Sequence, residues 1–192
     1  MAGGSGGGTN QTALAESAVC IATAWLMLTG KDLTFEDLSK KKSLDKVMRD
    51  VDRIADIGKL DTKTGIKKVL EFLRNDEAWL STTVRTARKI KKEKIGAKKD
   101  YHFHRDSKFM NDIYKVASGH IKKINKLGIR IDPNKWNPGD IWLARGAGLD
   151  GFPATKDLVS LNKTVLKKFK DCEIVGISLK KLSASSGIIP DF

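Results

Sequence analysis

Cysteine is scarce in this sequence: only Cys20 and Cys172 occur among 192 residues, far apart and in apolar surroundings. They form no CxxC pair and no metal-ligand spacing, so the sequence offers neither a disulfide framework nor a zinc site. We therefore expect both to be buried free thiols in a reducing compartment. This predicts a cytoplasmic protein.

The sequence also lacks a long uninterrupted apolar run. The longest, 13–28, is interrupted by Glu16 and two hydroxyl residues, and it falls short of the ~20 residues that a membrane-spanning helix needs. The N-terminus is rich in glycine and has no basic start of a secretory signal. We predict a soluble protein without a membrane partner, in which residues 1–11 are a flexible arm and 12–192 form a single domain.

Acidic residues are in the minority. The chain has 36 Lys and Arg against 23 Asp and Glu, a formal net charge of +13, and most of this excess lies in a basic segment at 85–126. A charge of this size predicts a polyanionic partner. Nucleic acid, and DNA in particular, is the first candidate, while an acidic protein and an anionic membrane surface are the alternatives.

Two groups of residues in the basic segment are candidates for phosphate contact. Lysines and arginines in a run give salt-dependent affinity without selecting a base sequence. The start of the following helix, for which Asp106 is the expected N-cap, adds hydrogen-bond donors that suit a phosphate. An ordinary solvated surface is the alternative interpretation of both groups. The candidates are Arg88, Lys89, Lys91, Lys92, Lys94, Lys98 and Lys99 in the run, with His104, Arg105 and Ser107 at the helix start.

Apolar periodicity predicts an α+β fold in which N-terminal helices precede a small mixed sheet, with a helix between its two best strands. Turn residues and glycines bound these elements, and Pro133 excludes a helix around itself. The expected helices are 12–28, a helical segment from 34 to a stop at Gly58, 63–73, 79–90, 106–128 and 157–169, and the strands are 141–144 and 172–182.

Polar residues mark the ends of the two predicted strands. Asp140 opens the first, and Ser178 and Lys180 lie on one face of the second, since alternate residues of a strand point the same way. If the strands are neighbours, Asp140 and Lys180 can meet at one end of the sheet.

This pattern, Pro138 with Asp140 before one strand and a lysine ending a later one, resembles the PD-(D/E)xK nuclease superfamily. The resemblance covers residues 12–28 and 136–182 and implies a restriction-endonuclease-like core. It further implies that Asp140 ligates Mg²⁺ or Mn²⁺, that Lys180 orients the attacking water, and that Glu16, from an early helix, is a further metal ligand. Hydrolysis of a phosphodiester uses such a metal to stabilise charge and to generate hydroxide.

The sequence departs from that family at three points. Ser178 stands where the second-strand acid is expected, a helix is predicted between the two strands, and only twelve residues follow Lys180. The expected core is therefore incomplete. Metal-dependent DNA cleavage is one hypothesis, and a catalytically inactive nucleic-acid-binding or phage virion structural protein is the alternative.

Each candidate site residue also has a purely structural interpretation. Asp140 can cap a turn, Lys180 can end a strand in solvent, and Glu16 can form a salt bridge with a basic residue. At the level of assembly, a homo-oligomer or a larger virion or replication complex is expected, located in a host cytoplasm or a virion if the protein is encoded by a bacteriophage.

Overall fold

In a computed structural model of the protein, the described residues are 6–57, 65–93, 100–136, 139–150, 152 and 154–179. They form seven α-helices, two short 3-10 helices and one four-stranded mixed sheet, so the predicted α+β class is confirmed. The helices are α1 (Gly6–Thr29), α2 (Phe35–Ser39), α3 (Lys41–Asp52), α4 (Gly65–Asn75), α5 (Glu77–Lys92), α6 (Lys108–Asn125) and α7 (Leu158–Lys170), with η1 (Pro133–Trp136) and η2 (Gly146–Gly148).

The sheet has the strand order β1-β2-β3-β4. Its first pair is parallel and the other two are antiparallel. A helix lies between β3 and β4, as expected, but the strands do not all follow the helices, because β1 precedes α4. The strands are β1 (Ala55–Ile57), β2 (His102–Arg105), β3 (Ile141–Ala144) and β4 (Ile174–Ile177).

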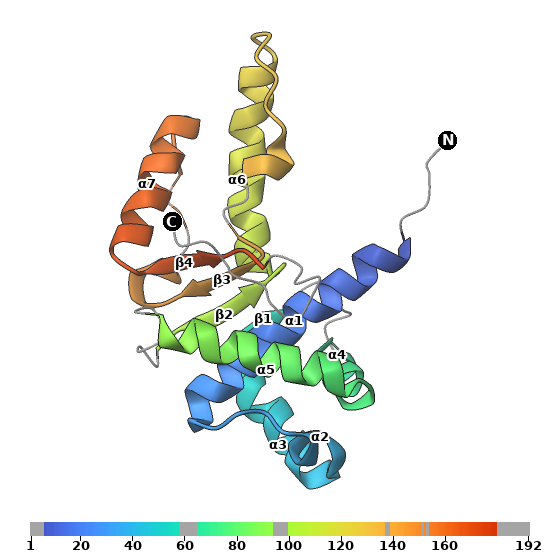
Figure 1. The fold of residues 1–192 in the computed structure, drawn as a ribbon. Helices are drawn as coiled ribbons and strands as arrows, with labels where there is room; N and C mark the ends of the chain where they lie inside the picture. The colour runs from blue at the N-terminus through green and yellow to red at the C-terminus, as the bar shows by residue number, and fades with distance from the viewer. Residues whose placement is uncertain are drawn as a thin grey trace.

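Helices cover the sheet on both faces (Figure 1), with α1 and α5 on one side and α6 and α7 on the other. The alternation of β3 explains why both faces need a cover. Ile141 and Leu143 belong to the large core that contains α1, whereas Trp142 and Ala144 pack with residues of α6 such as Ile113. Apolar residues on both faces of one strand thus produce three layers.

The central helix of the large core is α1. Two of its buried residues, Ser17 and Thr23, are polar. The hydroxyl of each donates a hydrogen bond of 2.7 Å to the carbonyl four residues earlier in the same helix. Among the described residues it is the one helix long and apolar enough to cross a membrane, over Thr12–Thr29, but 61% of that segment is buried inside the structure. Such burial is compatible with the core helix of a soluble protein.

Several predicted boundaries are wrong. The helix α1 begins at Gly6, inside the segment expected to be an arm. Pro133 was expected to exclude a helix around itself, but residues 133–136 form η1, since proline is tolerated at the first position of a helix. The N-cap of α6 is Ser107, whose side chain accepts a bond from Met110 N, while Asp106 adopts a positive φ of 51° just before it.

Candidate functional site

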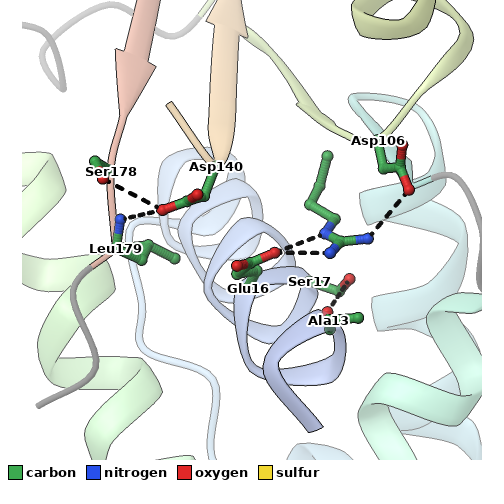
Figure 2. A network of polar contacts seen from close by, with 8 residues as sticks. Ala13, Glu16, Ser17, Asp106, Asp140, Ser178 and Leu179 are labelled. Carbon is green, nitrogen blue, oxygen red and sulfur yellow. Dashed lines mark hydrogen bonds and ion pairs between the residues drawn. The ribbon is translucent and has the colours of Figure 1, made fainter. Parts of the chain in front are cut away.

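The ends of three strands bring the predicted site residues to one edge of the sheet. Because β3 is antiparallel to β2 and β4, its first residues lie beside the last residues of both. The Asp140 amide donates to Ile177 O at 2.8 Å, and Asp140 Oδ2 accepts from Leu179 N at 2.6 Å and from Ser178 Oγ at 3.4 Å (Figure 2). The expected proximity of Asp140 to the end of the second strand is therefore observed, whereas Lys180 lies outside the described residues.

Glu16 approaches the same region from α1, where it forms an ion pair (Figure 2). Its Oε2 accepts bonds from Arg105 Nε at 3.1 Å and from the terminal nitrogen Nη2 at 2.7 Å. The two side chains are only 16% and 12% exposed, and a second carboxylate, Asp106, lies 3.5 Å from the guanidinium. The salt bridge that was the structural interpretation of Glu16 is the arrangement that the structure contains.

Asp140 and Glu16 were predicted as ligands of Mg²⁺ or Mn²⁺, which prefer carboxylate oxygens. Within the described part of the chain, no group of three or more His, Cys, Asp or Glu side chains is arranged to hold a metal ion. In this conformation one oxygen of each carboxylate is already engaged by a protein donor. Metal binding by these two residues therefore stays a prediction. A metal ion bound there would have to share the Glu16 carboxylate with the guanidinium of Arg105.

The strand β2 directs His104 into the interior, only 7% exposed. Burial, with a smaller effect of His102, lowers the pKa of His104 to about 4. Its Nδ1 lies 3.2 Å from Ser107 Oγ and 3.9 Å from Asp56 Oδ2, and its Nε2 is buried without a hydrogen bond among the described residues. Serine and aspartate thus approach the same ring nitrogen, so these three residues do not have the geometry of a catalytic triad, which uses both nitrogens.

Phosphate contact was predicted for His104, Arg105 and Ser107. Ser107 is fully buried as the cap of α6, His104 faces the interior, and Arg105 is held by two carboxylates. A surface phosphate cannot reach these donors in the conformation described. These residues do lie at a helix start, as expected, but His104 and Ser107 are buried there and Arg105 is engaged by Glu16.

The basic run, unlike His104 and Ser107, lies on the surface. Arg88, Lys89, Lys91 and Lys92 are exposed at the C-terminal end of α5. Arg88 is bound by Asp32, to which its Nε donates at 3.0 Å. No ion pair to a described acid involves the three lysines. The other predicted contacts, Lys94, Lys98 and Lys99, lie outside the described residues.

The segment 85–126 was expected to hold a phosphate backbone, but the prediction of individual residues named no lysine of α6 and none of α7. Exposed lysines recur along both helices, and Figure 1 shows these helices side by side on one side of the sheet. A signal was available, because Lys108, Lys115 and Lys122 are spaced by seven residues, which returns to nearly the same face of an α-helix. Lys163 and Lys170 of α7 repeat that spacing.

The site therefore contains a polar sheet edge, an inward-facing histidine and three helices with exposed lysines. Comparison of the chain with protein-family models, with curated proteins and with solved structures gave no match in any of the three.

Proposed function

We propose that the protein binds nucleic acid through exposed lysines of α5 and α6. The observation that carries this proposal is that Lys89 and Lys92 of α5 and Lys115 and Lys122 of α6 are exposed and form no ion pair with a described residue. Lys91 is exposed as well, near Asp32, which Arg88 already binds. Exposed lysines of this kind are available to the phosphates of a polyanion, and the chain as a whole carries a net charge of +13.

Helix stabilisation is the ordinary explanation for such lysines, because cations near a helix C-terminus interact favourably with its dipole. That explanation suits Lys89, Lys91 and Lys92, which occupy the last turn of α5, and Lys122, in the last turn of α6. It does not apply to Lys115, which lies in the middle of α6. Contact with phosphates accounts for a positive charge there, and an ordinary solvated helix face is the alternative interpretation.

A second candidate function is metal-dependent hydrolysis of phosphodiesters at the polar sheet edge. The observation in its favour is that Asp140 and Ser178 lie side by side at adjacent strand ends, with Glu16 contributed by α1. In this proposal Asp140 and Glu16 hold Mg²⁺ or Mn²⁺ and Lys180 orients the water that attacks phosphorus. Ser178 in place of an acid favours the catalytically silent version, a nucleic-acid-binding or virion protein.

The first experiment mixes the purified chain with labelled linear and circular DNA in Mg²⁺, in Mn²⁺ and in EDTA, and it records binding and cleavage separately. The binding proposal expects affinity in EDTA that falls steeply with salt. Absence of salt-sensitive binding overturns it. An acidic protein partner would then be the remaining candidate for the basic surface.

Cleavage is tested with Asp140→Asn and Lys180→Ala. Metal-dependent cleavage that both variants abolish, with binding in EDTA retained, supports the nuclease proposal. Binding without cleavage in either metal eliminates it and leaves the binding protein.

A further inference from the structure

The exposed face of α6 carries a straight row of positive charge. Lys108, Lys115, Lys122 and Lys126 follow one another at intervals of seven, seven and four residues, which places them on one side of a helix with 3.6 residues per turn. All four are exposed, and the opposite side contributes buried residues such as Met110, Ile113, Ala117 and Ile121 to the packed interior. We call these four lysines the α6 ridge.

The ridge is largely unneutralised. Lys108 pairs with Asp112, but Lys115, Lys122 and Lys126 have no ion pair with any described residue. With a rise of about 1.5 Å per residue, the ridge extends over about 27 Å. A DNA duplex presents about 16 phosphate charges over that length, one per ~1.7 Å of its axis with both strands counted, so the part of the duplex that faces the helix offers several phosphates to the four lysines.

Aromatic side chains are absent from this face. The two aromatic residues of α6, Phe109 and Tyr114, pack against Trp142. Among the described residues the only large exposed aromatic side chain is Phe35, on α2. Proteins that hold single strands without sequence preference stack bases on exposed aromatic rings. The ridge offers no such ring and no matched set of base-reading side chains, only charge on a rigid helix.

We propose that the α6 ridge is a binding surface for the phosphate backbone of double-stranded nucleic acid. This inference rests on the nucleic-acid binding proposed above and specifies its form. A rigid row of lysines suits a duplex, whose phosphates are already ordered, better than a flexible strand that has to be ordered on binding. The contact is independent of base sequence because it reaches only phosphates.

The helix α7 provides a matched control, because it carries the same kind of residue in a different setting. Lys163, Lys167 and Lys170 are exposed, but Lys167 pairs with Asp171 at 2.7 Å. Two exposed apolar residues, Val159 and Leu166, also lie on its outer face. Three lysines can thus be neutralised on either helix, with the same change in net charge.

The experiment compares the full chain with Lys115→Gln/Lys122→Gln/Lys126→Gln and with Lys163→Gln/Lys167→Gln/Lys170→Gln. Fluorescence anisotropy measures the affinity of each for a short labelled duplex and for one of its strands, in EDTA. We expect the α6 variant to bind the duplex at least tenfold more weakly than the α7 variant. Its plot of log affinity against log salt should be less steep by about 3, since each lost phosphate contact removes about one unit.

Three outcomes contradict the inference, and they are separable. Equal weakening by the α6 and α7 variants overturns the ridge as the surface but leaves nucleic-acid binding intact. Tighter binding of the single strand than of the duplex by the unmodified chain overturns the choice of partner. No salt-sensitive binding by the unmodified chain means that the proposed function itself fails. Circular dichroism and thermal unfolding of both variants verify that each is folded before affinities are compared.

Discussion

Arg105 lies between two carboxylates, and its position decides how Glu16 is interpreted. A charge removed from water is tolerated only where paired and hydrogen-bonded. Glu16 provides two such bonds to the guanidinium, and Asp106 adds a third contact. This ion pair therefore joins α1 to β2 by a polar contact inside an otherwise apolar interface.

Replacing Glu16 with glutamine leaves the shape of the side chain but removes its charge. We expect Glu16→Gln to lower the free energy of unfolding by about 3 kcal/mol, because it leaves Arg105 partly uncompensated in a mostly buried position. Urea unfolding at neutral pH measures this change.

The matched control is Glu71→Gln, which removes the partner of Lys67 in an ion pair whose side chains are 40% and 55% exposed. It should change stability by less than about 1 kcal/mol. Similar effects of the two substitutions would show that the Glu16–Arg105 pair is not structurally important.

His104 predicts a pH dependence of stability. Its pKa is about 4 in the folded protein because it is buried, whereas an unfolded histidine titrates near 6.5. As the pH falls, the unfolded chain therefore binds a proton first. Neutral His104 therefore contributes to the free energy of unfolding by an amount on the order of 3 kcal/mol, which is fully present above about pH 6.5. This contribution is lost as the pH falls from about 6.5 to about 4.

The measurement is the free energy of unfolding across this pH range for the unmodified protein and for His104→Gln, which has no titrating ring. Burial raises the pKa of the neighbouring Asp56, and this acts in the opposite direction, so the difference between the two proteins is the relevant quantity. We expect the unmodified protein to lose more stability on acidification. Parallel pH profiles would contradict this role of His104.

At the scale of elements, two glycines allow the chain to pass close to β4. A Cβ at Gly139 would lie 2.6 Å from Ile177 N, and one at Gly148 would lie 2.3 Å from Glu173 O. Both approaches are to backbone atoms, which cannot rotate away as a flexible side chain can. The connections at the two ends of β3 therefore require residues without a side chain.

We expect Gly139→Ala and Gly148→Ala each to destabilise the protein by about 2 kcal/mol or more, since overpacking forces backbone shifts. Gly119→Ala, in the exposed part of α6 where nothing lies within 4 Å, should instead stabilise it by up to about 1 kcal/mol because alanine is the better helix former. Thermal unfolding of the three variants tests both signs. A neutral Gly139→Ala would mean that β3 and β4 are less tightly joined than described.

The elements that the sequence predicted are those with a local signal. Apolar rhythm and flanking turn residues located α5, α7 and β3, and the two-residue period of a strand put Ser178 and Lys180 on one face. That Asp140 lies beside the end of β4 depended on the two strands being neighbours, which the structure shows. The strand β1 was missed because its three residues continue the apolar rhythm of α3 without a break. The pairing of Glu16 with Arg105 joins positions 89 residues apart, and nothing local to either residue indicates such a contact.

At the scale of the molecule, a net charge of +13 on 192 residues produces self-repulsion in the compact state. Salt screens this repulsion within about 10 Å at moderate ionic strength. We expect the Tm to rise when sodium chloride is increased from a low to a physiological level. Screening worth about 1 kcal/mol corresponds to roughly 2–4 °C for a chain of this size.

The variant with three ridge lysines replaced by glutamine provides the internal comparison, because it begins with less repulsion and should show a smaller rise. A Tm that falls with salt would indicate that favourable ion pairs, such as Arg88 with Asp32, outweigh the repulsion. Differential scanning calorimetry in the absence of nucleic acid makes the measurement.

The order in which the strands pair has a consequence for how the chain folds. No two neighbouring strands of the described sheet form a hairpin: Ala55 pairs with Phe103 and Leu143 with Val175, and helices occupy the intervening chain. The chain must lose the conformational entropy of closing these long loops before strand pairing stabilises it. This order of events slows folding. The individual helices can form earlier, because each of their hydrogen bonds joins residues only four positions apart. A refolding experiment should therefore show helical signal before the rings around Trp142 become fixed, and the packing of α6 against the sheet would be completed among the last parts of the molecule.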